Sequence, residues 1–198
     1  MKKIIFATNN QNKVEEIRSI IEDFFEVISL KEAGINIDIP EPHATLEENA
    51  SEKSKTIHAV TGENCFSEDT GLEVEALNGE PGVKSARYAG EGKSANDNLQ
   101  KLLHALKGAE NRKARFRTVI SLIINNSEEL FEGICEGEIT EVAKGHLGFG
   151  YDSIFIPDGA NKTFAEMVLA EKNQYSHRKK ATMKLASFLS TVGKNSCI

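Results

Sequence analysis

The first residues whose side chains could bind a ligand or take part in catalysis lie near the amino end, in the stretch ATNNQNK. An apolar run ends there, immediately before an amphipathic helical pattern. A helix start presents unpaired N–H groups and the positive end of the helix dipole, which together attract phosphate oxygens. The polar side chains available there are those of Thr8, Asn9, Asn10, Asn12 and Lys13. Taken alone, the segment has a simpler explanation, in which Asn12 caps the helix and Lys13 is solvated. The P-loop pattern of phosphate-binding proteins is absent from the sequence.

The second group is acidic and lies in SEDTGLEVEAL, where Glu68 and Asp69 follow an apolar run. Neighbouring residues of a strand point to opposite faces, so these two carboxylates are not expected to act as a matched pair. One of them at a strand end can bind Mg²⁺ or accept a proton from water. Glu41, in a loop before the second helical pattern, could complete a metal site with Asp69. The alternatives are a solvated acidic turn and a lone exposed Glu41.

A third group, GHLGFGYDSIF, combines glycines with Phe149, Tyr151 and Asp152. Glycines allow a backbone to approach a flat ligand closely, and an aromatic face can stack on a base. A tight turn into a strand that begins at Ser153 is the competing explanation.

The last group, EKNQYSHRKK, places Glu171, Lys172, His177 and Arg178 around the start of the final helical pattern. The planar guanidinium of Arg178 suits a phosphate or a carbonyl oxygen. A solvated charge cluster at a helix start is the alternative for this segment alone. The four groups together supply phosphate donors, a metal site, a stacking aromatic and a second cationic cluster, and this inventory suits a nucleotide.

The elements that must position these groups follow from hydrophobic periodicity and turn signals. Apolar or alternating runs predict strands at residues 3–8, 25–30, 65–67, 72–76 and 153–156. Two further runs, at residues 115–124 and 130–138, predict a hairpin across the polar NNSEE segment. Helical periodicity predicts helices at residues 13–24, 45–62, 94–108 and 176–192. On the second helix, Asn49 and Lys53 share a face with Leu46, Ala50 and Ile57, which points them inward or towards a cleft.

Composition limits the class of protein. A chain of 198 residues with 39% hydrophobic residues can bury one sizeable core, so we expect one mixed α/β domain over residues 1–198, with a frayed tail from about residue 193. The net charge of −6 argues against binding to nucleic acid. No signal peptide or membrane-length apolar run is evident, and three widely spaced cysteines indicate a reducing compartment, so a cytoplasmic protein with no membrane partner is expected.

The whole set resembles the inosine/xanthosine triphosphate pyrophosphatases, the HAM1-like non-canonical purine NTP pyrophosphatases. The resemblance runs in family order through ATNNQNK, EENA, EDTGL, PGVKSARYAG, GFGYDSIF, TFAEM and EKNQYSHR, and covers nearly the whole chain. It implies an elongated, twisted mixed sheet flanked by helices, in two lobes around a central nucleotide cleft. It also implies Mg²⁺-dependent hydrolysis of ITP, dITP and XTP to the nucleoside monophosphate and pyrophosphate by a cytoplasmic homodimer.

The resemblance assigns roles to residues by position. Glu41 and Asp69 match metal-associated carboxylates, and Asp69 also matches the proton acceptor. The matched substrate-binding positions are Thr8, Asn9, Asn10, Gln11, Asn12 and Lys13 at the phosphate side, Thr70 beside the acidic pair, and Phe149, Gly150, Tyr151, Asp152, Lys172, His177 and Arg178 at the base side. The chain departs from the family pattern at Ser153, where proline is common, and at Glu68, where aspartate is usual.

A mechanism follows as a hypothesis. Asp69 orients or deprotonates the water that attacks the α-phosphorus, while Lys13 and Lys53 neutralise the leaving pyrophosphate. Arg178 or His177 donates to the 6-keto oxygen, a contact that adenine would leave unpaired. Three alternatives remain open at this point: a pyrophosphatase for modified pyrimidine nucleotides or of the septum-inhibitor type, a nucleotide sensor without hydrolysis, and, least favoured, a nucleic-acid-binding module.

Overall fold

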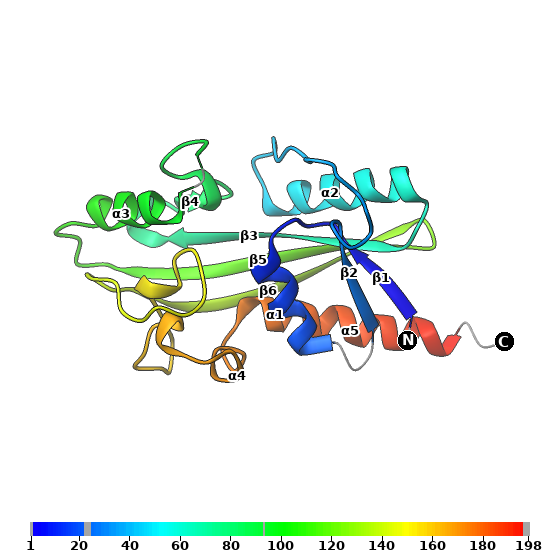
Figure 1. Ribbon diagram of the computed structural model, residues 1–198. Coiled ribbons are helices and arrows are strands. Elements are labelled where there is room, and N and C mark those ends of the chain that lie inside the picture. The colour runs from blue at the N-terminus through cyan, green and yellow to red at the C-terminus, as the bar shows by residue number, and fades with distance from the viewer. Residues whose placement is uncertain (1, 22–24, 93, 196–198) are drawn as a thin grey trace. The chain divides into compact units, whose positions relative to one another are not determined.

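The fold is built on one mixed β-sheet with helices on its faces, as the sequence predicts (Figure 1). The computed structural model describes residues 2–21, 25–92 and 94–195. The strands are β1 (Lys2–Phe6), β2 (Phe25–Ser29), β3 (Cys65–Val74), β4 (Pro81–Gly82), β5 (Lys113–Ile124), β6 (Ser127–Ile139) and β7 (Phe155–Pro157). Their order is β2-β1-β3-β5-β6-β7, with β4 paired to β3. Strand β1 runs parallel to β2 and β3, whereas β4 and β7 pair antiparallel with β3 and β6.

Helices separate the strands along the chain. The α-helices are α1 (Gln11–Ile21), α2 (Leu46–Thr61), α3 (Ala95–Ala105), α4 (Leu169–Lys172) and α5 (His177–Asn195). Short 3₁₀ turns are η1 (Glu75–Leu77), η2 (Ser85–Arg87), η3 (Asp152–Ile154) and η4 (Phe164–Glu166). Helix α5 continues to Asn195, and residues 196–198, where the predicted frayed tail ends, lie outside the described residues, as does Cys197.

The chain divides into two compact units. Unit 1 comprises the residues up to Asp69, Thr118–Gly133 and the residues from Arg178, and unit 2 comprises Thr70–Arg117 and Ile134–His177. Strands β3, β5 and β6 each contribute residues to both units. The prediction of a single domain over residues 1–198 stays a prediction, as does that of a central cleft.

In unit 1, helices pack on both faces of the strands. Helices α1 and α5 lie on one face, and α2 lies on the other (Figure 1). On the first face, the rings of Phe6 and Phe66 stack with centroids 4.5 Å apart, against apolar residues such as Ile17 of α1 and Leu185 of α5. On the second face, Ile57 of α2 packs in a cluster with residues of β3 and β5. The parallel strands therefore carry apolar side chains on both faces, as buried parallel sheets do.

In unit 2, the core is aromatic. Phe116, Phe155 and Phe164 contact one another at centroid distances of 4.7–6.1 Å, and the leucines of α3 belong to the same cluster. This cluster anchors the irregular segments that follow β6, because Tyr151 and Ile154 are buried in it.

Most predicted element positions agree with the structure, and three differ; residues 22–24, where the predicted first helix ends, lie outside the described residues. The strand predicted at residues 153–156 begins only at Phe155, because Asp152–Ile154 form the turn η3. Thr45 accepts from the Glu48 N–H at 3.2 Å, and Gly62 ends α2 in the left-handed conformation, as the capping pattern predicts. The predicted break at EDTG is wrong, because β3 runs unbroken through Gly71, whose backbone lies too close to Gly82 for any side chain. The predicted five-residue loop of the hairpin is shorter, because two asparagines with positive φ make the turn and β6 already begins at Ser127.

No helix among the described residues is long and apolar enough to cross a membrane.

Candidate active site

The start of α1 carries the predicted phosphate-side residues, all in unit 1. The Thr8 hydroxyl accepts from the Asn10 N–H at 3.2 Å, and the Asn10 side-chain oxygen accepts from the Lys13 N–H at 3.3 Å. Asn10, and not Asn12, therefore caps the helix. Gln11 and Asn12 are exposed at this end, and the Asn9 amide donates to the Ile37 carbonyl at 3.4 Å. An eleven-residue helix with exposed amides at its start suits phosphate oxygens.

Behind this helix start lies a buried chain of charges. The Lys13 ammonium pairs with the Glu68 carboxylate at 3.0 Å. Glu68 in turn accepts from Arg178 Nε and Nη2, each at 2.8 Å, while Arg178 Nη1 donates to Glu16. Glu68, Arg178 and Glu16 are all at least 94% buried. Burial alone would raise the pKa of Glu68, but Arg178 and Lys13 outweigh it and hold the pKa well below its usual value.

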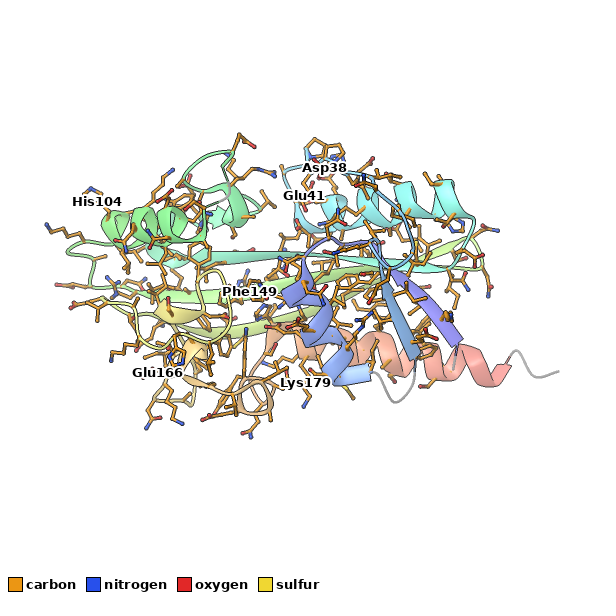
Figure 2. All side chains as sticks on the ribbon, in the orientation of Figure 1. Asp38, Glu41, His104, Phe149, Glu166 and Lys179 are labelled. Atoms are coloured by element: carbon orange, nitrogen blue, oxygen red, sulfur yellow. The ribbon has the colours of Figure 1, made fainter. Side chains whose placement is uncertain are left out.

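Asp69 points to a different partner from its neighbour Glu68, as strand alternation predicts. The Lys53 ammonium donates to Asp69 Oδ1 at 3.2 Å and to Glu41 Oε1 at 2.6 Å, so one cation joins both predicted metal-associated carboxylates (Figure 2 labels Glu41). Lys53 and Asn49 are buried on the inner face of α2, which confirms the predicted inward orientation. Burial raises the pKa of Asp69, although Lys53 and Lys13 act against this and Glu41 adds to the rise.

The acidic groups around Lys53 could also hold a metal ion. Two carboxylates meet at one point, but no group of three or more His, Cys, Asp or Glu side chains gathers to hold a metal among the residues described. Two carboxylates match Mg²⁺, which keeps several waters and takes substrate phosphate oxygens, better than a metal that needs a complete protein cage. The two carboxylates therefore fit the predicted Mg²⁺, with waters or phosphate oxygens as its other ligands.

The predicted base-side residues, apart from Arg178, lie in unit 2. Lys172 Nζ pairs with Asp152 Oδ2 at 2.7 Å, and the same oxygen accepts from the Phe149 N–H at 2.9 Å. The ammonium also lies over the Phe149 ring, 5.4 Å from its centroid, and 5.2 Å from that of Phe164. Gly148 is required here, because an added Cβ would lie 2.1 Å from the Asp152 carboxylate. A buried ammonium from α4, a carboxylate from η3 and the aromatic face of Phe149 thus meet in unit 2.

Two more of the predicted base-side residues, His177 and Tyr151, are packed in the interior of unit 2. The His177 ring is buried and stacks on Phe116, with centroids 4.7 Å apart. The Tyr151 ring belongs to the core, and its hydroxyl donates to the Ser85 carbonyl at 2.9 Å, so Tyr151 anchors the loop and does not offer a free stacking face. Gly150 adopts a positive φ of 62° in the turn between Phe149 and Tyr151. Thr70 directly follows Asp69 in β3.

The structure brings the acidic and phosphate-side residues together in unit 1 and most base-side residues together in unit 2. Arg178 is the exception, because its guanidinium lies with Glu68 and Glu16 in unit 1. Arg178 therefore belongs to the buried charge network, and its predicted contact with a base stays a prediction. Sequence reasoning missed Glu16. The available signal was its position three residues after Lys13, between Val14 and Ile17 on the buried side of a helix.

In this mixed α/β fold, carboxylates, lysines and the start of a helix lie together in unit 1. This arrangement is typical of a protein that binds a phosphorylated ligand at an acidic site. The chain belongs to the Ham1 family, which matches residues 4–188. Its relatives include proteins named dITP/XTP pyrophosphatase from Flavobacterium johnsoniae, 49% identical over 94% of this chain and 97% of the relative, and from Porphyromonas gingivalis, 51% identical over 96% and 98%. The Ham1 protein of Staphylococcus aureus has a similar structure, with a TM-score of 0.86 and 41% identity over 96% of this chain and 99% of that one.

Proposed function

We propose that this protein is a nucleoside triphosphate pyrophosphatase that hydrolyses dITP, XTP and ITP to the nucleoside monophosphate and pyrophosphate. Membership of the Ham1 family and the names of relatives about half identical to this chain support this assignment. The observation that carries it is the convergence of Glu41 and Asp69 on Lys53, in the same unit as the start of α1, which carries Lys13. A protein that only bound nucleotides would not need this pairing of carboxylates and cations.

Glu41 and Asp69 would hold Mg²⁺. The ion, when bound, would supply Lewis-acid polarisation of the phosphate oxygens. The chain's own residues bind the triphosphate, balance charge and accept a proton. The helix start and the amides of α1 bind the triphosphate, and Lys13 and Lys53 balance the charge that develops on the leaving pyrophosphate. Asp69 accepts the proton of the attacking water, as a carboxylate beside the bound phosphates can.

The base-side residues support a choice among purines. Hypoxanthine and xanthine present a 6-keto acceptor and an N1–H donor, whereas adenine reverses both. Lys172 can donate to the keto oxygen and Asp152 can accept from N1–H, while Phe149 stacks on the ring. Adenine would instead place an amino donor against the Lys172 ammonium and an acceptor nitrogen against the Asp152 carboxylate, and sites built on hydrogen bonds discriminate strongly against such a mismatch.

The first experiment measures pyrophosphate release from XTP, dITP, ITP, ATP and a modified pyrimidine triphosphate, with Mg²⁺ or with EDTA. We expect release from the first three only, and only with Mg²⁺. Asp69→Asn should lower kcat by roughly 10²–10³-fold without preventing nucleotide binding, because it removes the proton acceptor and retains the shape. Binding without hydrolysis in the wild type would favour a nucleotide sensor, and preference for the pyrimidine would favour the other pyrophosphatase class.

We also propose, from the same family resemblance, that the protein is a homodimer in the cytoplasm. Analytical ultracentrifugation would show twice the 21.8 kDa chain mass. Cell fractionation would test the compartment, and a protein found in the membrane fraction would contradict it.

A further inference from the structure

Glu41 lies in a segment without regular secondary structure, between Ile35 and the start of α2 at Leu46. A ligand on such a segment has no strand or helix to fix it, so other contacts must set its position. This matters for a metal site, because ligands must be held within a few tenths of an ångström to bind well.

One buried side chain fastens this segment. Asn49, fully buried on α2, accepts from the His43 N–H at 3.0 Å and donates to the His43 carbonyl at 3.2 Å. A single amide therefore satisfies both backbone groups of a residue two positions from Glu41. His43 also pairs with Glu52 at 3.7 Å, but both side chains are partly exposed, and such surface pairs contribute little.

We propose that Asn49 is a positioning residue that places Glu41 for binding of the divalent ion. Asn49 and Lys53 are one helical turn apart on α2. Asn49 fixes the backbone beside Glu41, and Lys53 fixes its carboxylate at 2.6 Å. This inference rests on the proposed function, because it takes Glu41 as a metal ligand. It adds a residue that acts through Glu41 and touches neither metal nor nucleotide.

The chain contains a matched control. Asn98, buried on α3 in unit 2, accepts from the Ala89 N–H at 2.6 Å and donates to the Ala86 carbonyl at 2.9 Å. It fastens the loop before its helix in the same way, but that loop carries neither of the two proposed metal ligands. Replacing either asparagine with alanine removes two hydrogen bonds of the same kind to partly buried backbone groups, so the two variants should lose similar stability.

The test is a titration of the nucleotide-free protein with Mn²⁺, with free Mn²⁺ followed by electron paramagnetic resonance. We expect Asn49→Ala to weaken Mn²⁺ binding by about tenfold, since residues that orient metal ligands typically contribute that much, and Asn98→Ala to leave it unchanged. In a Glu41→Gln background, Asn49→Ala should add nothing, because its effect passes through Glu41. Thermal unfolding of both alanine variants provides the matched stability comparison.

Each outcome bears on a different claim. If Glu41→Gln leaves Mn²⁺ affinity unchanged, the proposed metal site itself fails. If Glu41→Gln weakens binding but Asn49→Ala does not, only the positioning role of Asn49 is overturned. An additive effect in the double variant would also overturn it. Should Asn49→Ala fail to fold, Asn49→Ser, which keeps a smaller polar group, carries the same test with the same expected direction.

Discussion

The buried Arg178 network gives the most demanding stability prediction. Arg178 lies between Glu68 and Glu16, and none of the three has more than 6% of its surface exposed. Arg178→Met preserves much of the volume but leaves two buried carboxylates without their shared guanidinium. Breaking a buried ion pair in this way costs about 3–5 kcal/mol of unfolding free energy. For a chain of this size, that corresponds to a melting temperature lower by roughly 6–20 °C.

Urea unfolding followed by circular dichroism measures this loss. Arg115→Met is the control, because Arg115 pairs with Glu73 at 2.7 Å while 43% of its side chain remains exposed, so its loss should cost less than about 1 kcal/mol. Equal, small effects of both substitutions would refute the view that Arg178 is a buried structural cation.

The same variant has a pH signature. The pKa of Glu68 is depressed in the folded protein, so its contribution is present above the usual value of 4.5 and is lost as the pH falls towards the folded value. Without Arg178 this depression shrinks, and the acid-dependent part of the stability should become smaller in Arg178→Met than in the wild type.

Two further predictions concern α2 and β3. His58 contacts the Glu63 carbonyl at 2.8 Å and Asn126 Oδ1 at 2.9 Å, and these bonds raise its pKa above 6.5, so its stabilising contribution is complete below pH 6.5 and is lost as the pH rises through the folded pKa. Melting curves at several pH values should show this loss in the wild type and not in His58→Gln. Burial raises the pKa of Cys65 to about 12, so peptide mapping should find Cys65 unmodified by a thiol reagent at pH 8 until the protein is unfolded; rapid native labelling would contradict its burial.

Local signals in the sequence predicted the elements well. The capping box at Thr45 and the glycine after α2 act within a single turn, so they can be recognised without knowledge of the fold. The hairpin was predicted for the same reason, although its turn proved tighter. The break expected at Gly71 failed because the glycine serves a close approach to Gly82, a partner eleven residues away that periodicity does not reveal.

The pairing of charges depended on the fold. Adjacent positions in a strand correctly predicted different partners for Glu68 and Asp69, but the sequence could not show that Arg178, 110 residues away, would join Glu68. Asn49 and Lys53 were predicted to face inward from helical spacing. The hydrogen bonds of Asn49 to His43 required the path of a loop, which has no periodic signal.

The position of Lys53 between Glu41 and Asp69 has a consequence for how the protein is handled. The Lys53 ammonium balances the negative charge of both carboxylates, so the protein can fold without a bound metal ion. Proteins whose framework is closed by a metal unfold when a chelator removes it. Here chelation should abolish turnover while the protein stays native, and returning the ion should restore activity without a refolding step.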